Sequence, residues 1–237
     1  MGLSSELGKF GTDITFKFDS GKGIWFTSDS HYGHTNIIRY CKRPFENAEE
    51  MNEKLIENWN SVVQPDDIVF HLGDFCFGGA PLWNAMLDRL NGKIYLIFGN
   101  HDLKNLKQGF MHRFAWTGFQ AQIYIENRLI YLNHYPFLCY AGVYRGENSA
   151  WQLFGHVHSQ KKEISYETIT NGEVKEILSK DESRLKYLFP TQYDVGVDNN
   201  NYTPISYEQV KEIITYQQEL YKMEKEKENE TSEESSL

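Results

Sequence analysis

Short apolar runs alternate with amphipathic stretches along the first half of the chain. Three runs rich in β-branched and aromatic residues predict buried strands at 24–28, 67–71 and 93–98. Between them, apolar residues recur at helical spacing over 48–62 and 82–90, which predicts two helices with one buried face each. This βαβαβ order favours an α/β fold.

The second half of the chain shows more strand than helix. Apolar and polar positions alternate in two neighbouring segments joined at Asn127-Arg128, which predicts a β-hairpin. The expected elements are strands at 122–126, 129–134, 151–154 and 193–197, and a final amphipathic helix at about 206–221.

One large domain accounts best for the 237 residues, because a chain of this length can bury a substantial core. We expect that domain at 21–221, after an N-terminal extension at 1–20. The acidic stretch at 222–237 is almost devoid of core residues, so we expect a disordered tail that begins as frayed helix. A polar stretch with a turn signal at its centre predicts an exposed hairpin insertion at 159–190.

Charge and cysteine content limit the class of protein. The formal net charge of -9 argues against a general nucleic-acid coat, since phosphate backbones repel surplus carboxylates. Three cysteines do not form a disulfide framework, and no run approaches the roughly 18 apolar residues of a membrane span. We therefore expect a cytoplasmic protein without a membrane partner, whose oligomeric state leaves no signal in the sequence.

Residues able to carry chemistry follow directly after predicted strands. Six of the eight histidines lie there, in clusters with Asp or Asn. In α/β folds the ends of strands bring distant parts of the chain to one crevice. The clusters are Asp29-Ser30-His31 with His34, Gly73-Asp74, Gly99-Asn100-His101-Asp102, Asn133-His134 and Gly155-His156-Val157-His158.

Each cluster alone has an ordinary structural interpretation beside the metal-binding one. Asp29 and His31 are two residues apart, so extended backbone would turn both to one side, but a polar loop pair has the same pattern. His156 and His158 repeat this spacing with two imidazoles. Asp74 after a strand is often a turn or cap, although a carboxylate is also suited to bridging two cations.

Five such clusters together are improbable as accidents. They supply carboxylates, imidazoles and one amide oxygen, which comes from segment 99–102. Taken alone, that segment would indicate only the start of a helix. The absence of cysteine among them disfavours a structural zinc site. We expect two divalent metal ions in a catalytic pair, drawn from Mn, Fe, Zn, Co or Ni, with Mn expected in vitro.

The order of these clusters, D-x-H, G-D, G-N-H-D, H and G-H-x-H, resembles that of the calcineurin-like metallophosphoesterases over about 24–199. The resemblance implies an α/β/β/α sandwich with two central mixed sheets flanked by helices, and metal-dependent hydrolysis of phosphoric esters. Blocks at 25–31, 43–45 and 193–198 further resemble a small bacterial and phage-type branch of that family.

The resemblance also implies a division of roles. Asp74 would bridge the two ions, and a hydroxide between the ions would attack the phosphorus. His101 would face the substrate phosphate and would not bind metal. One ion would be held by Asp29, His31 and His158, and the other by Asn100, His134 and His156.

The chain departs from the protein Ser/Thr phosphatase branch at Phe77, where that branch has an Asp that orients the catalytic His. We therefore do not expect phosphoprotein phosphatase activity as the main function. Asp102 or a backbone carbonyl would orient His101 instead. His34 would either donate to a phosphate oxygen or leaving group, or pack at a helix start.

Several residues near the clusters are candidates for contact with substrate. Asn36, Arg39 and Arg43 would form a phosphate-facing edge. Arg43, which precedes Pro44, is the better candidate for fixed placement, with a solvated cation as the alternative interpretation. Aromatic residues after His134 could stack on a base, although core or lid packing is the favoured interpretation. They are Tyr135, Phe137, Tyr140, Tyr144 and Trp151.

From these observations we expect a dinuclear phosphoesterase that hydrolyses a phosphomonoester or phosphodiester, with a nucleotide or other small phosphorylated molecule as substrate. A DNA or RNA nuclease is the alternative among enzymes, and only 39–43 and 104–107 hint at the basic approach that it would need. A non-catalytic metallophosphoesterase-like binding protein is the second alternative, although such proteins typically lose ligands and every ligand position is filled here.

Overall fold

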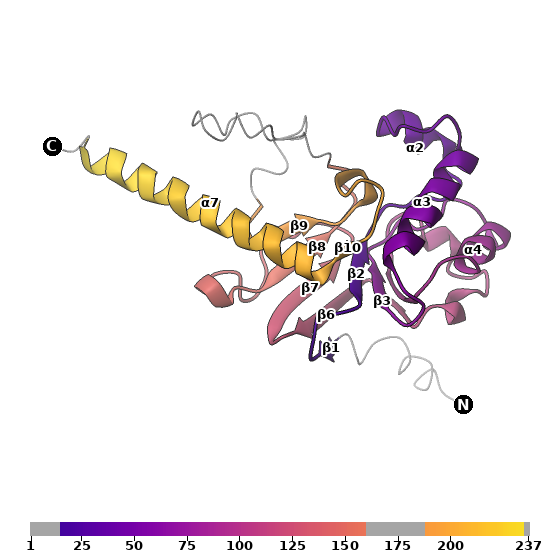
Figure 1. Cartoon of the computed structure of the whole chain (residues 1–237), viewed down its shortest axis with the longest axis horizontal. Helices are drawn as coiled ribbons and strands as arrows, with labels where there is room; N and C mark the ends of the chain where they lie inside the picture. The colour runs from indigo at the N-terminus through magenta and orange to yellow at the C-terminus, as the bar shows by residue number, and fades with distance from the viewer. Residues whose placement is uncertain (1–14, 160–187, 235–237) are drawn as a thin grey trace.

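Two five-stranded sheets form the framework of the protein, for which a computed structural model describes residues 15–159 and 188–234 (Figure 1). The first sheet consists, in spatial order, of β10 (Ile205–Ser206), β2 (Ile24–Thr27), β3 (Ile68–His71), β4 (Lys93–Ile97) and β5 (Trp116–Gly118). The second consists of β1 (Thr15–Phe18), β6 (Gln120–Ile125), β7 (Arg128–Asn133), β8 (Trp151–Phe154) and β9 (Gln192–Asp194). Each sheet contains parallel and antiparallel pairs, so the prediction of two mixed sheets flanked by helices is confirmed.

The first sheet is covered on both faces. Phe26 and Phe70 face the second sheet and stack with ring centroids 5.7 Å apart in the core between the sheets. Val69 and Leu96 belong to the other apolar core, which helices α3 (Ala48–Val62) and α4 (Ala80–Leu87) share. Burial on both faces is why these strands are continuous apolar runs in the sequence.

Helix α3 has the bounds that the hydrophobic spacing predicted. Its N-cap Asn47 accepts a hydrogen bond from the Glu50 backbone N–H at 2.9 Å, which satisfies one of the free donors at the helix start. The apolar positions then recur along one face and pack against the first sheet. The fully buried members of that face include Met51, Leu55 and Trp59.

The hairpin of the second sheet joins β6 to β7. Alternate residues of β6, Ala121, Ile123 and Ile125, are fully buried toward the core between the sheets. The turn lies at Glu126-Asn127, one residue before the predicted position, and both residues have positive φ (50° and 65°). Two such residues make the primed turn that matches the twist of an antiparallel pair.

The two ends of the domain differ from the sequence prediction. Strand β1 lies within the extension predicted at 1–20 and pairs with β6, so the sheet begins earlier than expected. Helix α7 (Tyr207–Glu234) runs on through most of 222–237, further than the frayed helix predicted at the start of a disordered tail, and extends away from the sheets in Figure 1. Glu and Lys, which make up much of this stretch, are good helix formers, so helix propensity favours its continuation.

Some short elements gave no clear pattern in the sequence. Helix α2 (Thr35–Tyr40), β5 and β10 were not predicted, because two to six residues are too few to show a period. The predicted insertion at 159–190 lies almost wholly outside the described residues. Among the described helices, none is both long and apolar enough to cross a membrane.

Two substitutions in α7 test which part of this helix stabilises the fold. Ile214 is fully buried in the apolar core that contains Phe26 and Phe70, so Ile214→Ala should lower the free energy of unfolding by about 2–5 kcal/mol. Met223 is 53% exposed, so Met223→Ala should change the free energy of unfolding by less than about 0.5 kcal/mol. Urea denaturation measures both. Equal losses would show that the extended half of α7 is packed in solution.

Candidate metal centre

The seven predicted ligands converge at the carboxyl ends of five strands. Asp29, Asp74 and Asn100 follow β2, β3 and β4, which are parallel neighbours in the first sheet. The imidazoles of His134 and of the pair at 156–158 follow β7 and β8, parallel neighbours in the second sheet. Because the sheets face each other, residues up to 129 positions apart meet at one edge of the sandwich.

Three of these residues, Asp29, His31 and His158, form the first ligand group. Their candidate ligand atoms lie within 4.8 Å of one another. Asp29 Oδ1 is 3.8 Å from His31 Nε2 and 3.7 Å from His158 Nε2. Asp29 Oδ1 and His31 Nε2 are buried without a hydrogen-bond partner. Buried polar atoms without partners are costly, and a cation among these three atoms would satisfy them.

Asp74, Asn100, His134 and His156 form the second ligand group. The ligand atoms of Asp74, His134 and His156 also lie within 4.8 Å of one another, and Asn100 Oδ1 is 3.3 Å from His134 Nε2. Asn100 and His156 are exposed, whereas Asp29 and His31 are buried. The second group is therefore the side of the centre that faces solvent.

One carboxylate oxygen lies between the two ligand groups. Asp74 Oδ2 is 3.5 Å from His31 Nε2 and 3.6 Å from His134 Nε2. The other oxygen, Oδ1, accepts a hydrogen bond from the His101 backbone N–H at 2.8 Å. This bond fixes the carboxylate so that Oδ2 points into the space that the two groups share, and the position suits a bridging ligand.

Three of the candidate ligand imidazoles have their Nδ1 atoms engaged by another group. His134 Nδ1 donates to the Leu72 carbonyl at 2.7 Å, and His158 Nδ1 donates to Asp198 Oδ2 at 2.7 Å. His31 Nδ1 lies 3.3 Å from Nδ1 of His34. A proton held on Nδ1 leaves the lone pair on Nε2, the atom that each ring turns toward the carboxylates.

The ligands stand on a strained backbone, which the sequence did not reveal. The spacing suggested extended chain at 29–31 and 156–158, but these ligand residues adopt left-handed φ angles, where non-glycine residues are uncommon. Backbone hydrogen bonds from Asp29 N to Gly73 O and from His31 N to Asp74 O hold two of these loops together. The positive φ angles are 58° at Asp29, 51° at His31, 54° at Asp74, 70° at His156 and 49° at His158.

Two glycines permit the close approach of the loops. A Cβ on Gly99 would overlap with Asp74 Oδ1, and a Cβ on Gly155 would overlap with Ser28 Oγ and Asp29 Oδ2. Neither overlap can be relieved by the far end of a flexible side chain, because the carboxylates are themselves fixed. The glycines that precede Asn100 and His156 are therefore required for the ligands to converge.

His101 lies beside both groups and is open to solvent. Its side chain is 38% exposed, and Nε2 is 3.9 Å from Asp74 Oδ2. Asp102 does not orient this ring, contrary to one of the two sequence hypotheses. Its buried carboxylate accepts hydrogen bonds from the backbone N–H groups of Asp74, Phe75 and Gly99. Burial raises the pKa of Asp102 to about 7, and its role is to join two ligand loops.

His34 lines the centre from α2. Its ring stacks on Phe77 with centroids 3.9 Å apart and planes 7° apart, at the position where the phosphatase branch has its Asp. If His31 uses Nε2 for metal, its Nδ1 carries the proton and His34 Nδ1 accepts it. The remaining hydrogen of His34 is then on Nε2. Burial, followed by the charge of His101, lowers the pKa of His34 to about 4.

Neither candidate arginine lines the cavity at the metal centre. Arg43 is only 4% exposed and makes an ion pair with Asp198 at 2.7 Å, so it is neither a phosphate contact nor a solvated cation. All three nitrogens of its guanidinium donate hydrogen bonds within the fold. Arg39 is exposed, 5.3 Å from the Tyr40 ring centroid, and does not line the cavity at the metal centre.

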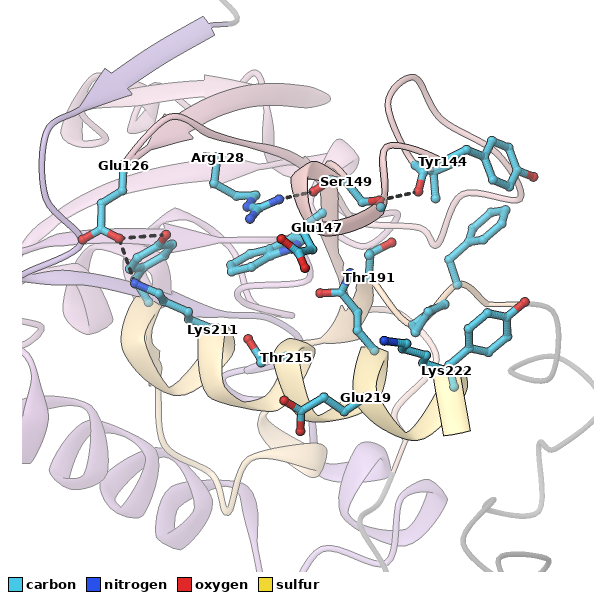
Figure 2. A pocket seen from close by; sticks show the side chains of 18 residues that line it. Glu126, Arg128, Tyr144, Glu147, Ser149, Thr191, Lys211, Thr215, Glu219 and Lys222 are labelled. Atoms are coloured by element: carbon cyan, nitrogen blue, oxygen red, sulfur yellow. Dashed lines mark hydrogen bonds and ion pairs between the residues drawn. The ribbon is translucent and has the colours of Figure 1, made fainter. Parts of the chain in front are cut away.

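A cavity of about 470 Å³ opens over the ligand groups. Asn36 and Tyr40 of α2 line one side, and Phe77 and His101 line another. A larger cavity of about 1010 Å³ lies between α7 and segment 143–151, where Figure 2 shows Lys211, Thr215 and Glu219 of α7. None of the predicted ligands lines the larger cavity, so size alone does not locate the chemistry.

Three of the five aromatic residues after His134 pack in the apolar cores, as favoured, whereas Tyr144 is 80% exposed. Tyr140 and Trp151 are buried in the apolar cores. Tyr135 is the exception at the centre, because it is 44% exposed and its hydroxyl is 3.4 Å from Asn100 Oδ1. A stacking surface built from the whole set is therefore excluded, and Tyr135 alone is placed near the second group.

Sequence reasoning missed two polar residues that support the centre. The Asp198 side chain is fully buried and accepts a hydrogen bond from His158, and Asp198 lies in the block at 193–198 that the resemblance singled out. His71 is fully buried at the end of β3, within 2.9 Å of Ser30 Oγ, and its Nδ1 accepts from the Gly73 backbone N–H. As a single polar residue ending an apolar strand, His71 gave no signal that could have found it.

Comparison with known proteins agrees with this geometry. Residues 23–187 match the family described as calcineurin-like phosphoesterase. An uncharacterized protein of Methanocaldococcus jannaschii is 51% identical over 85 residues, which are 35% of this chain and 48% of that protein, so the match spans about half of that relative. The gene 66 protein of Mycobacterium phage L5 is 29% identical over 163 residues, 57% of this chain and 77% of that protein.

A solved structure shares the fold. A crystal structure of a protein of unknown function from Aquifex aeolicus has a TM-score of 0.58 and 24% sequence identity with this chain. The structural match covers 80% of this chain and 98% of the Aquifex aeolicus chain. The arrangement of two facing sheets is therefore that of an observed protein, at nearly its full length.

His71 makes stability depend on pH. Burial lowers its pKa from 6.5 to about 3, so the folded protein binds this proton more weakly than the unfolded chain. The contribution is fully present above pH 6.5 and is lost as pH falls toward 3. The test is urea unfolding of the metal-free protein at pH 7 and at pH 5. Between these pH values the free energy of unfolding should fall by about 2 kcal/mol more for the wild type than for His71→Gln.

His112→Gln is the matched control for this measurement, because His112 is exposed. It should keep the pH dependence of the wild type. If His71→Gln and the wild type lose stability in parallel between the two pH values, His71 is not the buried neutral base that its surroundings indicate.

Proposed function

The chain belongs to the calcineurin-like phosphoesterase family, and on that premise we propose that it is a dinuclear metal-dependent hydrolase of phosphomonoesters or phosphodiesters. A nucleotide or another small phosphorylated molecule is the proposed substrate. The observation that carries the proposal is the position of Asp74 Oδ2 within 3.6 Å of an imidazole nitrogen from each ligand group. A single carboxylate shared in this way suits two adjacent cations.

The donor sets fit divalent metal ions. Asp29, His31 and His158 would hold one ion, with Asp29 Oδ1 and His31 Nε2 gaining the partner that they lack. Nitrogen and oxygen donors without thiolate suit Mn, Fe, Zn, Co or Ni, and Mn is proposed for work in vitro. Two bound ions would activate water and offset charge on the phosphoryl oxygens. The other ion would be held by Asn100, His134 and His156, with Asp74 between the two.

The side chains around the ligands would do the remaining work. His101 reaches the space beside Asp74 Oδ2 with Nε2, so it can stabilise a phosphoryl oxygen or give its proton to the leaving oxygen. His34 presents Nε2–H to the same cavity while Phe77 holds its ring from behind. Both rings are positioned without being ligands, which leaves their protons available.

The dimensions of the centre favour a small substrate. A cavity of about 470 Å³ falls in the range of small-molecule sites, which is about 300–1,000 Å³. Its rim carries Tyr40, which is 63% exposed and 6.5 Å from the His34 ring centroid. An exposed aromatic ring beside a phosphate site suits a nucleotide base, with the phosphate over the ligand groups.

Separate substitutions test the proposed division between ligand and proton donor. His101→Ala should retain two ions per chain and lower kcat by about 10²–10⁴-fold, because only a proton-transfer group is removed. Asp74→Asn should lose bound metal together with activity, because the shared carboxylate is gone. Elemental analysis and turnover of an aryl phosphate measure both. Unchanged turnover in both variants would sink the assignment.

A nuclease is the second candidate, and one observation favours it. Lys104 Nζ lies 3.7 Å from the centroid of Phe77, whose ring also stacks on His34. This stacking holds an exposed cation beside the cavity, where a second phosphate of a polynucleotide could meet it. A single cation is a small basic surface for a nuclease, so the small substrate remains the preferred proposal.

Salt dependence separates these two candidates. Between about 50 and about 200 mM salt, hydrolysis of a small ester should change little, whereas a nuclease that makes many phosphate contacts loses about 10³–10⁵-fold in affinity. Lys104→Gln should leave the small-ester kcat/KM within about twofold of the wild type. Lys107→Gln serves as the control. Preferential cleavage of an oligonucleotide, weakened by salt and by Lys104→Gln alone, would establish the nuclease.

A non-catalytic binding protein is the remaining alternative. It would bind two ions and turn over no aryl phosphate, phosphodiester or cyclic nucleotide. We also propose a cytoplasmic location, because an odd number of cysteines, three, is not typical of a disulfide framework and suits a reducing compartment.

A further inference from the structure

Two blocks that the resemblance singled out at 43–45 and 193–198 meet behind the metal centre. Arg43 Nε donates to Asp198 Oδ1 at 2.8 Å, and Arg43 Nη2 donates to Asp198 Oδ2 at 2.7 Å. Both side chains are fully buried at this contact. A two-pronged pair between residues 155 positions apart fixes the relative position of the segments that carry it.

This pair also holds both halves of the first ligand group. Asp198 Oδ2 accepts from His158 Nδ1 at 2.7 Å. Arg43 Nη2 donates to the Asp29 carbonyl at 2.7 Å, and Arg43 Nη1 donates to the Ser30 carbonyl at 3.1 Å. The loop that carries Asp29 and His31 is thus tied to the imidazole of His158 through one buried ion pair.

The second ligand group is held in a different way. His134 Nδ1 donates to the Leu72 carbonyl, which is a main-chain atom that no substitution removes. Asp74 Oδ1 is likewise held by a main-chain N–H, that of His101. The orientation of the His158 ring therefore depends on a side chain, whereas the orientations of His134 and of the Asp74 carboxylate depend on main-chain atoms.

We propose that Arg43 and Asp198 are positioning residues for the first metal site and set its affinity independently of the second. This inference rests on the proposed function, because it assumes that both groups bind metal. The carboxylate holds His158 with Nε2 toward Asp29 Oδ1, and the guanidinium holds the Asp29 loop in its left-handed conformation. Partners of this kind orient ligand imidazoles and typically change metal affinity by about 10–100-fold when removed.

The test is Mn²⁺ binding to the whole chain, followed by isothermal calorimetry and electron paramagnetic resonance. The wild type should bind two ions and show the signal of a spin-coupled pair. Asp198→Asn should bind one ion as before and the other about 10–100-fold more weakly. At metal concentrations that saturate the wild type, this variant should show the signal of an isolated ion.

Two further variants keep the result interpretable. Asp198→Asn leaves Arg43 as a buried charge, so the double variant Arg43→Gln with Asp198→Asn removes both charges and should show the same loss at one site. Asp67→Asn is the matched control, because Asp67 also accepts two hydrogen bonds, from Trp25 Nε1 and Gln64 N, at the opposite end of β3. It should bind both ions as the wild type does.

The outcomes separate the two proposals. Two unchanged affinities in both Asp198 variants would overturn the inference and leave the proposed function standing. Equal weakening of both sites would also overturn it, since that result indicates a general loss of structure. A wild type that binds no Mn²⁺ or other divalent ion would contradict the proposed function and the inference with it. One weakened site beside one intact site would establish the positioning role.

Discussion

The rest of the structure depends on the concentration of acidic and imidazole ligand atoms at one buried edge of the two sheets. Asp29 Oδ1 and His31 Nε2 are buried without partners, and several ligand residues adopt left-handed backbone conformations. Each of these features costs folding free energy, and the strained residues alone cost on the order of 1–3 kcal/mol each. A protein keeps such an arrangement only where the surroundings hold it in place.

Buried polar residues that touch no predicted substrate hold these ligand loops. Asp102 joins the loops after β3 and β4 by accepting three backbone hydrogen bonds. His71 joins the loops after β2 and β3 through Ser30 and Gly73. The Arg43–Asp198 pair connects the β2 loop to His158. Each is more deeply buried than the solvent-facing candidate ligands Asn100 and His156, so the candidate centre is buried on one side and open to solvent on the other.

This asymmetry explains why several sequence hypotheses for polar residues changed. The residue types of Arg43 and Asp102 suit a phosphate contact and a catalytic acid. In the structure, however, the guanidinium and the carboxylate form hydrogen bonds to main-chain groups within the fold. In His34 and His101, by contrast, at least one ring nitrogen is not engaged in such a contact, and both residues line the cavity. The chemistry of a side chain is therefore decided by which of its polar atoms the fold has already used.

Much of the fold and of the candidate centre followed from the sequence alone. The apolar runs of β2, β3 and β4 and the bounds of α3 were readable because burial on defined faces imposes a period of two or 3.6 residues. The candidate ligand residues could be predicted because their residue types recur after successive strands in a characteristic order. Neither inference requires knowledge of which loop approaches which.

Only the tertiary structure decided how these residues are oriented. The left-handed backbone at Asp29 and His158, the separation into a buried and an open ligand group, and the meeting of Arg43 with Asp198 all depend on contacts between distant segments. Local sequence determines the ligand types that each strand end carries, because periodicity and composition are local. It cannot determine the direction of a side chain whose conformation is fixed by a residue 155 positions away.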